Sequence, residues 1–133
     1  MIYLDSNVFI YAVLNQGEPG TWCRDLLKGV VKGDTPALTS VLAVDEVVYQ
    51  VREARGLEPS VETGETLLQT PNLEVAAADT AVLWRALDLS RAHRMFPRDA
   101  IHAATALLRG VPEIASEDTD FDEIPGLRRR WRR

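Results

Sequence analysis

Four carboxylates could together form a metal site or a catalytic site: Asp5, Glu46, Asp99 and Asp118. Each stands near the beginning or end of a predicted helix or strand, and the loops at the carboxyl ends of parallel strands converge on one edge of a sheet. Four carboxylates gathered there would repel one another strongly unless a cation lay between them. Ligation by oxygen alone suits Mg²⁺ or Mn²⁺. The pattern therefore predicts a metal-dependent phosphodiesterase, and first of all a nuclease.

Asp5 is the most specific of these positions because it directly follows the buried strand predicted at residues 2–4. Ser6 or Asn7 can cap the helix that comes next, so the sequence does not require Asp5 as a cap. A carboxylate at a buried strand end is costly unless it is paired or bound to a metal. Ser6 and Asn7 are themselves auxiliary candidates, able to orient a carboxylate or position a water.

Glu46 and Asp99 lie on predicted helices, where a solvated charge or a favourable interaction with the helix dipole is the simpler interpretation. Glu46 shares a mixed face with Leu42 and Tyr49, opposite a valine-rich face. A helix that is apolar on both sides is deeply buried or has a partner on its second face. The face with Leu42 and Tyr49 is therefore a candidate protein–protein surface. His102 falls close to Asp99 on its helix and is interpreted as a hydrogen-bonded surface or half-buried residue, with a phosphate contact as the alternative.

The acidic segment from Ser116 to Asp122 could also bind a metal. A calcium-binding loop is the obvious competitor, but the central glycine and the distant bidentate glutamate are missing. Asp118 comes directly after a predicted strand and is the preferred ligand, with Asp120 as an auxiliary residue. Phe121 is predicted to anchor the segment in the core.

Apolar periodicity predicts alternating strands and helices, which indicates an α/β fold with a mostly parallel sheet covered on both faces. The helix at 7–14 is followed by a turn at 17–20, and Gly33 and Gly56 are predicted to end later helices. The predicted strands lie at 2–4, 37–39, 73–77, 113–116 and 127–131, and the remaining helices at 21–31, 40–55, 60–69, after Asp79, and from Asp99 to Gly110.

The chain of 133 residues is predicted to be one domain, residues 1–133, with a basic tail at 128–133. That tail holds five of the fifteen basic residues, so the rest carries ten basic against twenty acidic residues, a net charge of −10. So acidic a body is not typical of a non-specific nucleic-acid binder. The tail is interpreted as a solvated end or an arginine-protected edge strand; alternatively it contacts phosphate, with Trp131 stacking on a base.

A single cysteine, Cys23, excludes an internal disulfide and agrees with a reducing compartment. The apolar amino end lacks a basic region and is interrupted by Asp5, and no window is long and apolar enough to span a bilayer. We therefore expect a cytoplasmic protein without a membrane partner.

The motifs around these acids resemble the PIN-domain family, and within it the VapC-type toxins of toxin–antitoxin pairs. They are Leu4-Asp5-Ser6-Asn7-Val8, Thr39-Ser40 followed by Glu46, the run from Pro97 to Ala106, and Ser116 to Phe121 with Pro125-Gly126-Leu127 behind it. The resemblance spans nearly the whole chain, in the family's order. It implies a three-layer α/β/α sandwich with a central, mostly parallel sheet of four to five strands.

The resemblance further implies an Mg²⁺- or Mn²⁺-dependent endoribonuclease that acts on RNA, a VapB-type antitoxin lying over the acidic site, and a homodimer. It carries over Asp5, Glu46, Asp99 and Asp118 as the metal-binding acids, Asp120 as an auxiliary residue, and Ser116 at a position where a hydroxyl is usual. The Leu42 and Tyr49 face then becomes a candidate dimer or antitoxin surface.

Two other functions fit parts of the pattern. A haloacid-dehalogenase-like phosphatase also uses an aspartate after its first strand, but it needs a second aspartate where Asn7 stands. A non-catalytic module could use the same acids to hold a structural ion or to bind a basic peptide or RNA. The acids alone do not discriminate RNA from DNA.

Overall fold

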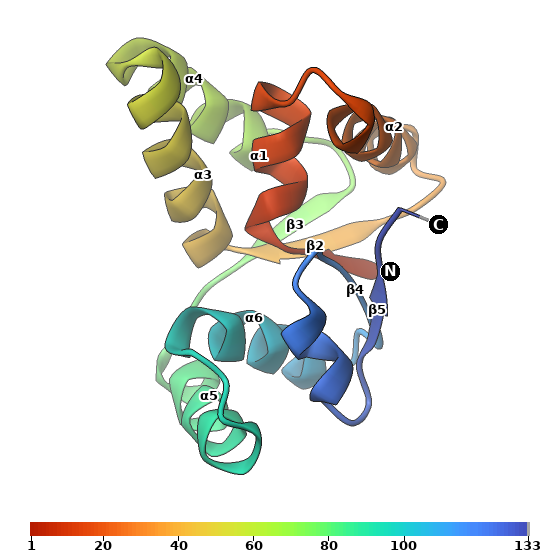
Figure 1. Ribbon diagram of the computed structural model, residues 1–133, viewed down its shortest axis with the longest axis vertical. Coiled ribbons are helices and arrows are strands. Elements are labelled where there is room, and N and C mark those ends of the chain that lie inside the picture. Colours follow the sequence, from red (N-terminus) through yellow and green to blue (C-terminus); the bar gives the residue numbers. More distant parts are fainter. Residues whose placement is uncertain (133) are drawn as a thin grey trace.

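A sheet of five parallel strands forms the centre of the computed structural model, which describes residues 1–132 (Figure 1). The strand order is β3-β2-β1-β4-β5, so the first strand lies in the middle and the chain adds strands first to one side of it and then to the other. All four neighbouring pairs are parallel. The strands are β1 (Ile2–Leu4), β2 (Ala37–Ser40), β3 (Leu73–Ala76), β4 (Glu113–Ala115) and β5 (Arg128–Arg130).

Helices cover both faces of the sheet, which confirms the predicted three-layer α/β/α sandwich (Figure 1). One layer contains α1 (Ser6–Leu14), α2 (Glu18–Lys32), α3 (Val41–Arg55) and α4 (Leu57–Leu68). The other contains α5 (Thr80–His93), α6 (Pro97–Leu108) and the short 3₁₀ helix η1 (Thr119–Glu123).

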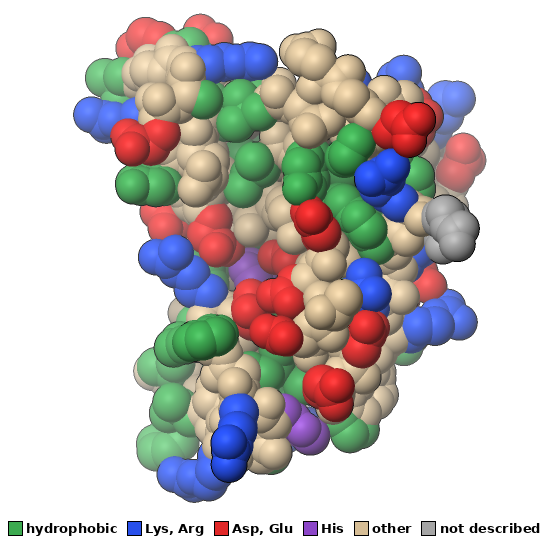
Figure 2. Space-filling view, in the orientation of Figure 1, with side chains coloured by type: hydrophobic (Ala, Val, Ile, Leu, Met, Phe, Trp, Pro, Cys, Tyr) green, Lys and Arg blue, Asp and Glu red, His purple; other side chains and the backbone are tan. Residues whose placement is uncertain are grey.

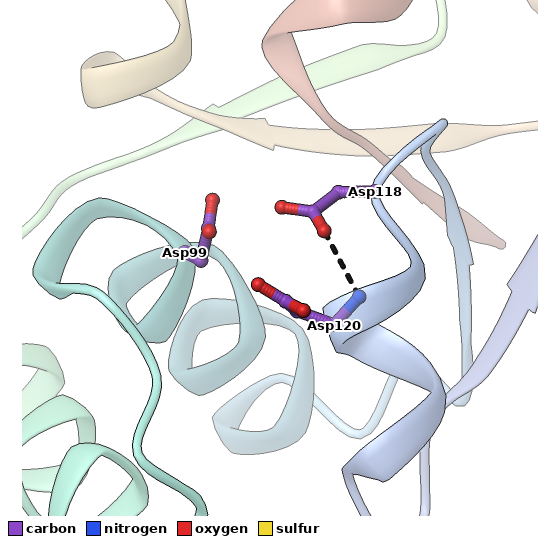
Figure 3. Close-up of side chains that lie close together, drawn as sticks. All are labelled: Asp99, Asp118 and Asp120. Carbon is purple, nitrogen blue, oxygen red and sulfur yellow. Dashed lines mark hydrogen bonds between the residues drawn. The ribbon is translucent and has the colours of Figure 1, made fainter.

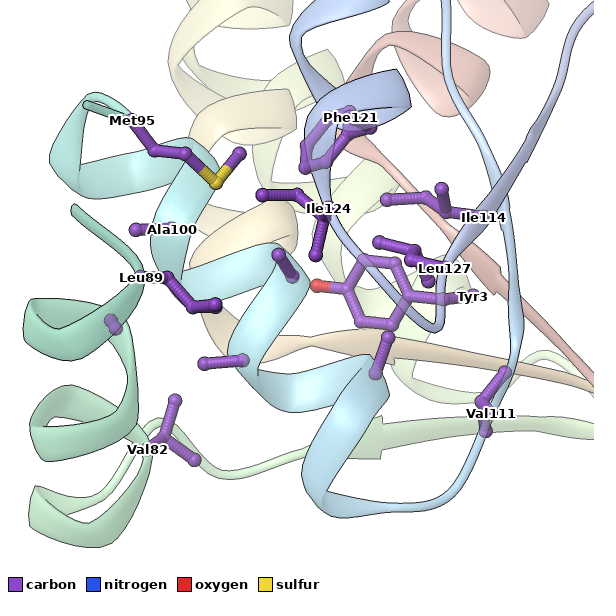
Figure 4. Close-up of a cluster of buried hydrophobic side chains, with 14 of the residues drawn as sticks. Tyr3, Val82, Leu89, Met95, Ala100, Val111, Ile114, Phe121, Ile124 and Leu127 are labelled. Atoms are coloured by element: carbon purple, nitrogen blue, oxygen red, sulfur yellow. The ribbon is translucent and has the colours of Figure 1, made fainter. Parts of the chain in front are cut away.

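Two hydrophobic cores follow from the alternation of side chains along the central strands. On β1, Ile2 and Leu4 join the core beneath α1 to α4, whereas Tyr3 points to the opposite face and joins the core beneath α5, α6 and η1 (Figure 4). Buried alanines along α6 keep side-chain volume small there, so that helix lies close to the sheet. Phe121 is fully buried in this second core, as predicted.

Several helices begin earlier than predicted, and each difference has a local cause. Asp5 caps α1, with its carboxylate accepting a hydrogen bond from the Ser6 backbone N–H, so the interpretation of Ser6 or Asn7 as the cap was wrong. The residues predicted as a turn at 17–20 form the cap and first turn of α2, because Pro19 is tolerated where a helical N–H has no partner anyway. Helix α6 likewise starts at Pro97, which places Asp99 in its first turn rather than at its start.

Glycine ends two helices, as predicted. Gly33 adopts a left-handed conformation at the end of α2, with φ of 89°. Gly56, with φ of 91°, ends α3 and also caps α4, so α4 starts at Leu57 instead of residue 60. Cys23 is buried and free, and no helix within residues 1–132 is long and apolar enough to span a membrane.

Truncation of Phe121 tests whether η1 is held by the core rather than by its own hydrogen bonds. We expect Phe121→Ala to lower the free energy of unfolding by about 3–5 kcal/mol, because it leaves a cavity beneath η1. Urea unfolding followed by circular dichroism measures the change. Leu68→Ala, at a side chain that is mostly exposed, serves as the control and should change the stability by less than about 0.5 kcal/mol. Equal effects of the two substitutions would contradict this account of the core.

Candidate metal centre

The candidate site lies at the carboxyl end of the sheet, between β1 and β4. The chain order reverses there, since β2 lies on one side of β1 and β4 on the other, and ligands of open α/β sheets bind at such a point. Asp5 follows β1, and its backbone N–H donates to the carbonyl of Ala115 at the end of β4. Ser116 and Asp118 follow β4 directly. The parallel register thus brings residues more than 100 positions apart into contact.

Three aspartates form the tightest acidic cluster of the described chain (Figure 3). One carboxylate oxygen each from Asp99, Asp118 and Asp120 lies within 4.8 Å of the others. Asp99 projects from the first turn of α6, whereas Asp118 caps η1 by accepting a hydrogen bond from the backbone N–H of Asp120 at 2.9 Å. The capping bond fixes the Asp118 carboxylate toward Asp99.

A buried network joins the remaining two acids to the site through His102. The imidazole is only 1% exposed, and its Nε2 lies 2.8 Å from Glu46 Oε1 and 3.5 Å from Asp5 Oδ1. Its Nδ1 lies 2.6 Å from the Tyr3 hydroxyl. Because a carboxylate can only accept, the Nε2–H must donate to Glu46, and in the neutral imidazole Nδ1 then accepts from Tyr3.

Ser116 links Asp5 to the aspartate cluster. Its hydroxyl donates to Asp5 Oδ2 at 2.7 Å and accepts from the backbone N–H of Asp118 at 3.0 Å. Asp5 is therefore held at both oxygens, by Ser116 on one side and by the Ser6 backbone N–H on the other. The two groups of acids consequently share one hydrogen-bonded framework.

The electrostatics of the site favour a cation. Burial and the neighbouring Asp118 carboxylate, together with the charge of Asp5, raise the pKa of Asp99 from 3.8 to about 7. Burial alone would lower the pKa of His102, but the hydrogen bond to Glu46 and the charges of Asp5 and Glu46 outweigh burial and raise it. Burial and the nearby Asp5 also raise the pKa of Tyr3 well above its usual range.

The structure groups the predicted acids in a way that the sequence did not specify. Asp120, predicted only as an auxiliary residue, belongs to the tight cluster with Asp99 and Asp118. Glu46 lies at the same sheet edge, but its carboxylate is engaged with His102. Asp5 lies between the two groups and is both a helix cap and a partner of Ser116.

The two auxiliary residues after Asp5 differ in what they contact. The Ser6 hydroxyl lies 3.5 Å from Asp5 Oδ1, the outer limit for a hydrogen bond, so the backbone N–H provides the main contact. The Oδ1 atom of Asn7 is buried and has no hydrogen-bond partner within residues 1–132. An unpaired buried acceptor is unusual and calls for a donor from water or a bound group.

His102 is the residue that the sequence interpretation placed least well. It was expected to be a surface or half-buried residue, yet it is buried and contacts two of the predicted site acids. Its position three residues after Asp99, on the same helix face, was the one available signal.

The basic tail is an edge strand, as one of the two interpretations predicted. Arg128 pairs with Glu113 in the adjacent strand, Arg129 with Asp122 and Arg132 with Glu18. Arg133, also assigned to the tail, lies outside the described residues. The Trp131 ring packs at 5.1 Å from that of Trp22, so it contributes to a folded aromatic cluster. These ion pairs use much of the charge that a phosphate contact would need.

The donor set suits a hard divalent cation. Carboxylate oxygens are the ligands that Mg²⁺ and Mn²⁺ prefer, and the nearest nitrogen ligand, His102 Nε2, already donates to Glu46. Burial first, and then the neighbouring Asp118 and Asp5 carboxylates, raise the pKa of Asp99, and a divalent ion would offset both effects. Figure 2 shows acidic side chains gathered on the surface between the two helical layers, with a histidine visible among them.

The PIN domain family profile matches residues 2–127, nearly the whole chain. The chain belongs to the PIN domain family. The resemblance that its motifs suggested is thereby confirmed, and the matched segment ends just before the arginine-rich strand. No curated protein matches the chain in sequence.

Solved structures of toxin–antitoxin proteins share this fold. VapC20 from Mycobacterium tuberculosis, a toxin described as cleaving the sarcin–ricin loop, aligns with a TM-score of 0.77 at 14% identity, over 92% of this chain and 93% of that one. The DNA-bound VapBC complex from Salmonella typhimurium gives 0.73 at 21% identity, over 98% and 96%. A toxin–antitoxin complex from Klebsiella pneumoniae gives 0.71 at 20% identity, over 96% and 95%. The chain is thus similar in fold to VapC proteins.

The raised pKa of Asp99 predicts a stability that falls with increasing pH when no divalent ion is present. A carboxyl group whose pKa is higher in the folded than in the unfolded state favours folding below its unfolded pKa, and this contribution is lost as the pH rises through the folded value of about 7. The wild-type melting temperature, measured in chelator, should therefore fall more between about pH 5 and pH 8 than that of Asp99→Asn.

The exposed Asp88→Asn variant is the control for this measurement and should follow the wild type. Addition of Mg²⁺ at about pH 8 should raise the melting temperature of the wild type and have a smaller effect on that of Asp99→Asn, which lacks one of the proposed ligands. Parallel pH profiles of wild type and Asp99→Asn would show that the carboxylates are not crowded in solution.

Proposed function

We propose that this protein is an Mg²⁺- or Mn²⁺-dependent endoribonuclease and the toxin of a toxin–antitoxin pair. The observation that carries the proposal is the convergence of Asp99, Asp118 and Asp120 within 4.8 Å, beside Asp5 at the end of the central strand. Membership of the PIN domain family and the VapC-like fold support the same activity. We also propose that residues 1–133 act as one domain in the cytoplasm.

The residues have distinct roles in this proposal. Asp99, Asp118 and Asp120 provide oxygen ligands, and Asp5 provides a further ligand at their edge. A bound Mg²⁺ or Mn²⁺ would lower the pKa of a water and stabilise charge on the scissile phosphate. Asp99 must lose its proton to serve as a ligand, which its pKa of about 7 allows near neutral pH.

The surrounding groups position these ligands. Ser116 holds Asp5 and the Asp118 backbone in a fixed relation, and His102 holds Glu46 toward Asp5. Glu46 acts within the site either as a direct ligand or indirectly through His102, because its hydrogen bond raises the pKa of the imidazole and so favours the protonated form. Mutation of such outer partners of metal ligands typically lowers metal affinity or activity by about 10- to 100-fold.

A VapB-type antitoxin is the proposed protein partner. Structures of VapBC complexes, from Rickettsia felis and Salmonella typhimurium, have this fold at 18% and 21% identity. The body of the chain carries ten basic against twenty acidic residues outside the tail. A basic antitoxin segment would therefore be attracted to the acidic surface and would cover the proposed catalytic site.

A homodimer is also proposed, through the exposed face of α5. One face of that helix presents three apolar side chains, Leu83, Trp84 and Leu87, which are 47%, 71% and 51% exposed. The other candidate face, around Leu42 and Tyr49 on α3, exposes less apolar surface because Leu42 is half-buried. Exposed apolar clusters of this kind commonly mark protein–protein contacts.

Replacing the proposed ligands tests the nuclease. Asp5→Asn and Asp99→Asn should each reduce RNA cleavage by about 100-fold or more, because each removes a negative charge that helps to hold the divalent ion, while circular dichroism shows an unchanged fold. The exposed Asp88→Asn variant should retain activity. Full activity of both ligand variants at saturating Mg²⁺ would reject the assignment.

Metal removal separates the nuclease from a non-catalytic binding module. Cleavage of a panel of single-stranded RNAs should stop in chelator and return with Mg²⁺ or Mn²⁺, and the same-sequence DNA panel establishes the sugar preference. Retained RNA binding without any metal-dependent cleavage would favour the binding module instead.

A charge introduced on the apolar face tests the dimer. Trp84→Glu should halve the mass measured by light scattering, because a carboxylate in a dimer interface is costly to desolvate. Tyr49→Glu tests the α3 face under the same conditions and should leave the mass unchanged. The opposite pattern would assign the dimer to the face around Leu42 and Tyr49.

A further inference from the structure

A hollow opens directly beside the acidic site. It has a volume of about 430 Å³, and it is formed by α1, α3 and the start of α6. Ser6 and Glu46 belong both to this hollow and to the candidate site, so the two are continuous. Its volume lies in the range of small-ligand sites.

The lining of this hollow combines one cation with an exposed aromatic ring and an amide. Arg98 comes from α6, next in sequence to Asp99, while Tyr49 and Gln50 come from α3. The Tyr49 side chain is 61% exposed, so its ring is accessible. A cation, an aromatic ring and a hydrogen-bonding amide are the groups that bind the phosphate, the π-face and the edge of a nucleotide.

Arg98 differs from the arginines of the tail in its pairing. Arg128, Arg129 and Arg132 each pair with a carboxylate, whereas Arg98 makes no ion pair within residues 1–132. Two acids, Asp45 and Glu46, line the same hollow, but neither forms an ion pair with Arg98 within residues 1–132. The guanidinium is thus left available to an anion, at the edge of a site that otherwise repels phosphate.

We propose that this hollow binds the nucleotide of single-stranded RNA adjoining the scissile phosphate. Arg98 pairs with the phosphate of that nucleotide, its base stacks on Tyr49, and Gln50 hydrogen-bonds the base edge. This inference rests on the proposed nuclease function and extends it by naming the residues that position the strand. Arg98 and Tyr49 are positioning residues in this scheme, because the hydrolytic groups lie in the aspartate cluster.

Two measurements on the full chain test this subsite. The first is the initial rate of cleavage of a degenerate single-stranded RNA 20-mer in Mg²⁺. Arg98→Gln should raise KM about tenfold and leave kcat within twofold, since the lost contact holds the strand in the ground and transition states alike. Arg98→Lys should recover part of the affinity. Tyr49→Ala should raise KM by roughly five- to 100-fold, and Tyr49→Phe should match the wild type because it retains the ring.

The second measurement is binding of the same RNA, labelled with fluorescein, followed by anisotropy in chelator at several salt concentrations. Without a metal no hydrolysis intervenes, so this binding reports the subsite even if the nuclease proposal fails. The slope of log affinity against log salt should fall by about 0.7 for Arg98→Gln, the value for one phosphate contact to a single strand. Arg91→Gln, an exposed arginine on α5, is the matched control and should bind RNA as the wild type does.

Three outcomes would overturn the subsite. The first is wild-type KM, binding and salt slope in Arg98→Gln. The second is a reduced mass of Tyr49→Ala in light scattering, which would assign the ring to a subunit contact. The third is unchanged RNA binding in Arg98→Gln together with weaker binding of the antitoxin, which would assign the hollow to the protein partner. A wild type that fails to cleave RNA, with Arg98→Gln still weakening its binding, would reject the nuclease alone.

Discussion

The mutual repulsion of carboxylates at one edge of the sheet is the constraint around which this structure is arranged. Burial and the neighbouring acids raise the pKa of Asp99 to about 7, which shows how unfavourable the ionised cluster is without a counter-charge. Ser116 and His102 partly offset this cost by hydrogen-bonding Asp5 and Glu46. A fold that retains such a cluster favours binding of a divalent ion, and the chemistry proposed for this protein follows from that need.

Helix capping and core packing hold the framework around the cluster in place. Asp118 caps η1, whose Phe121 is buried in the second core, and Asp99 sits on an alanine-rich helix packed closely against the sheet. Tyr3 connects His102 to the same core from the central strand. Packing and the geometry of the acidic site are therefore coupled, so a cavity far from the acids, such as one beneath η1, would also disturb them.

Acidic and basic groups are separated along this chain of negative net charge, which bears on the proposed nuclease function. The tail arginines are mostly held in ion pairs, so they do little to attract RNA. In the proposed function, affinity for an RNA strand would depend on the metal and on Arg98, which lines the hollow beside the acids and makes no ion pair within residues 1–132. In the same proposal, a basic antitoxin segment would compete with RNA for this acidic surface.

Apolar periodicity and turn chemistry are local properties, so the amino-acid order was enough to predict the α/β class, the strands and the glycine helix ends. It also placed Phe121 in the core. It singled out four acids as candidates for a metal site, and that assignment stays a prediction. The tertiary structure decided which acids meet, since this depends on the strand order that brings residue 5 beside residue 116. For the same reason the burial of His102 and the place of Asp120 beside Asp99 emerged only once the helices had packed on the sheet.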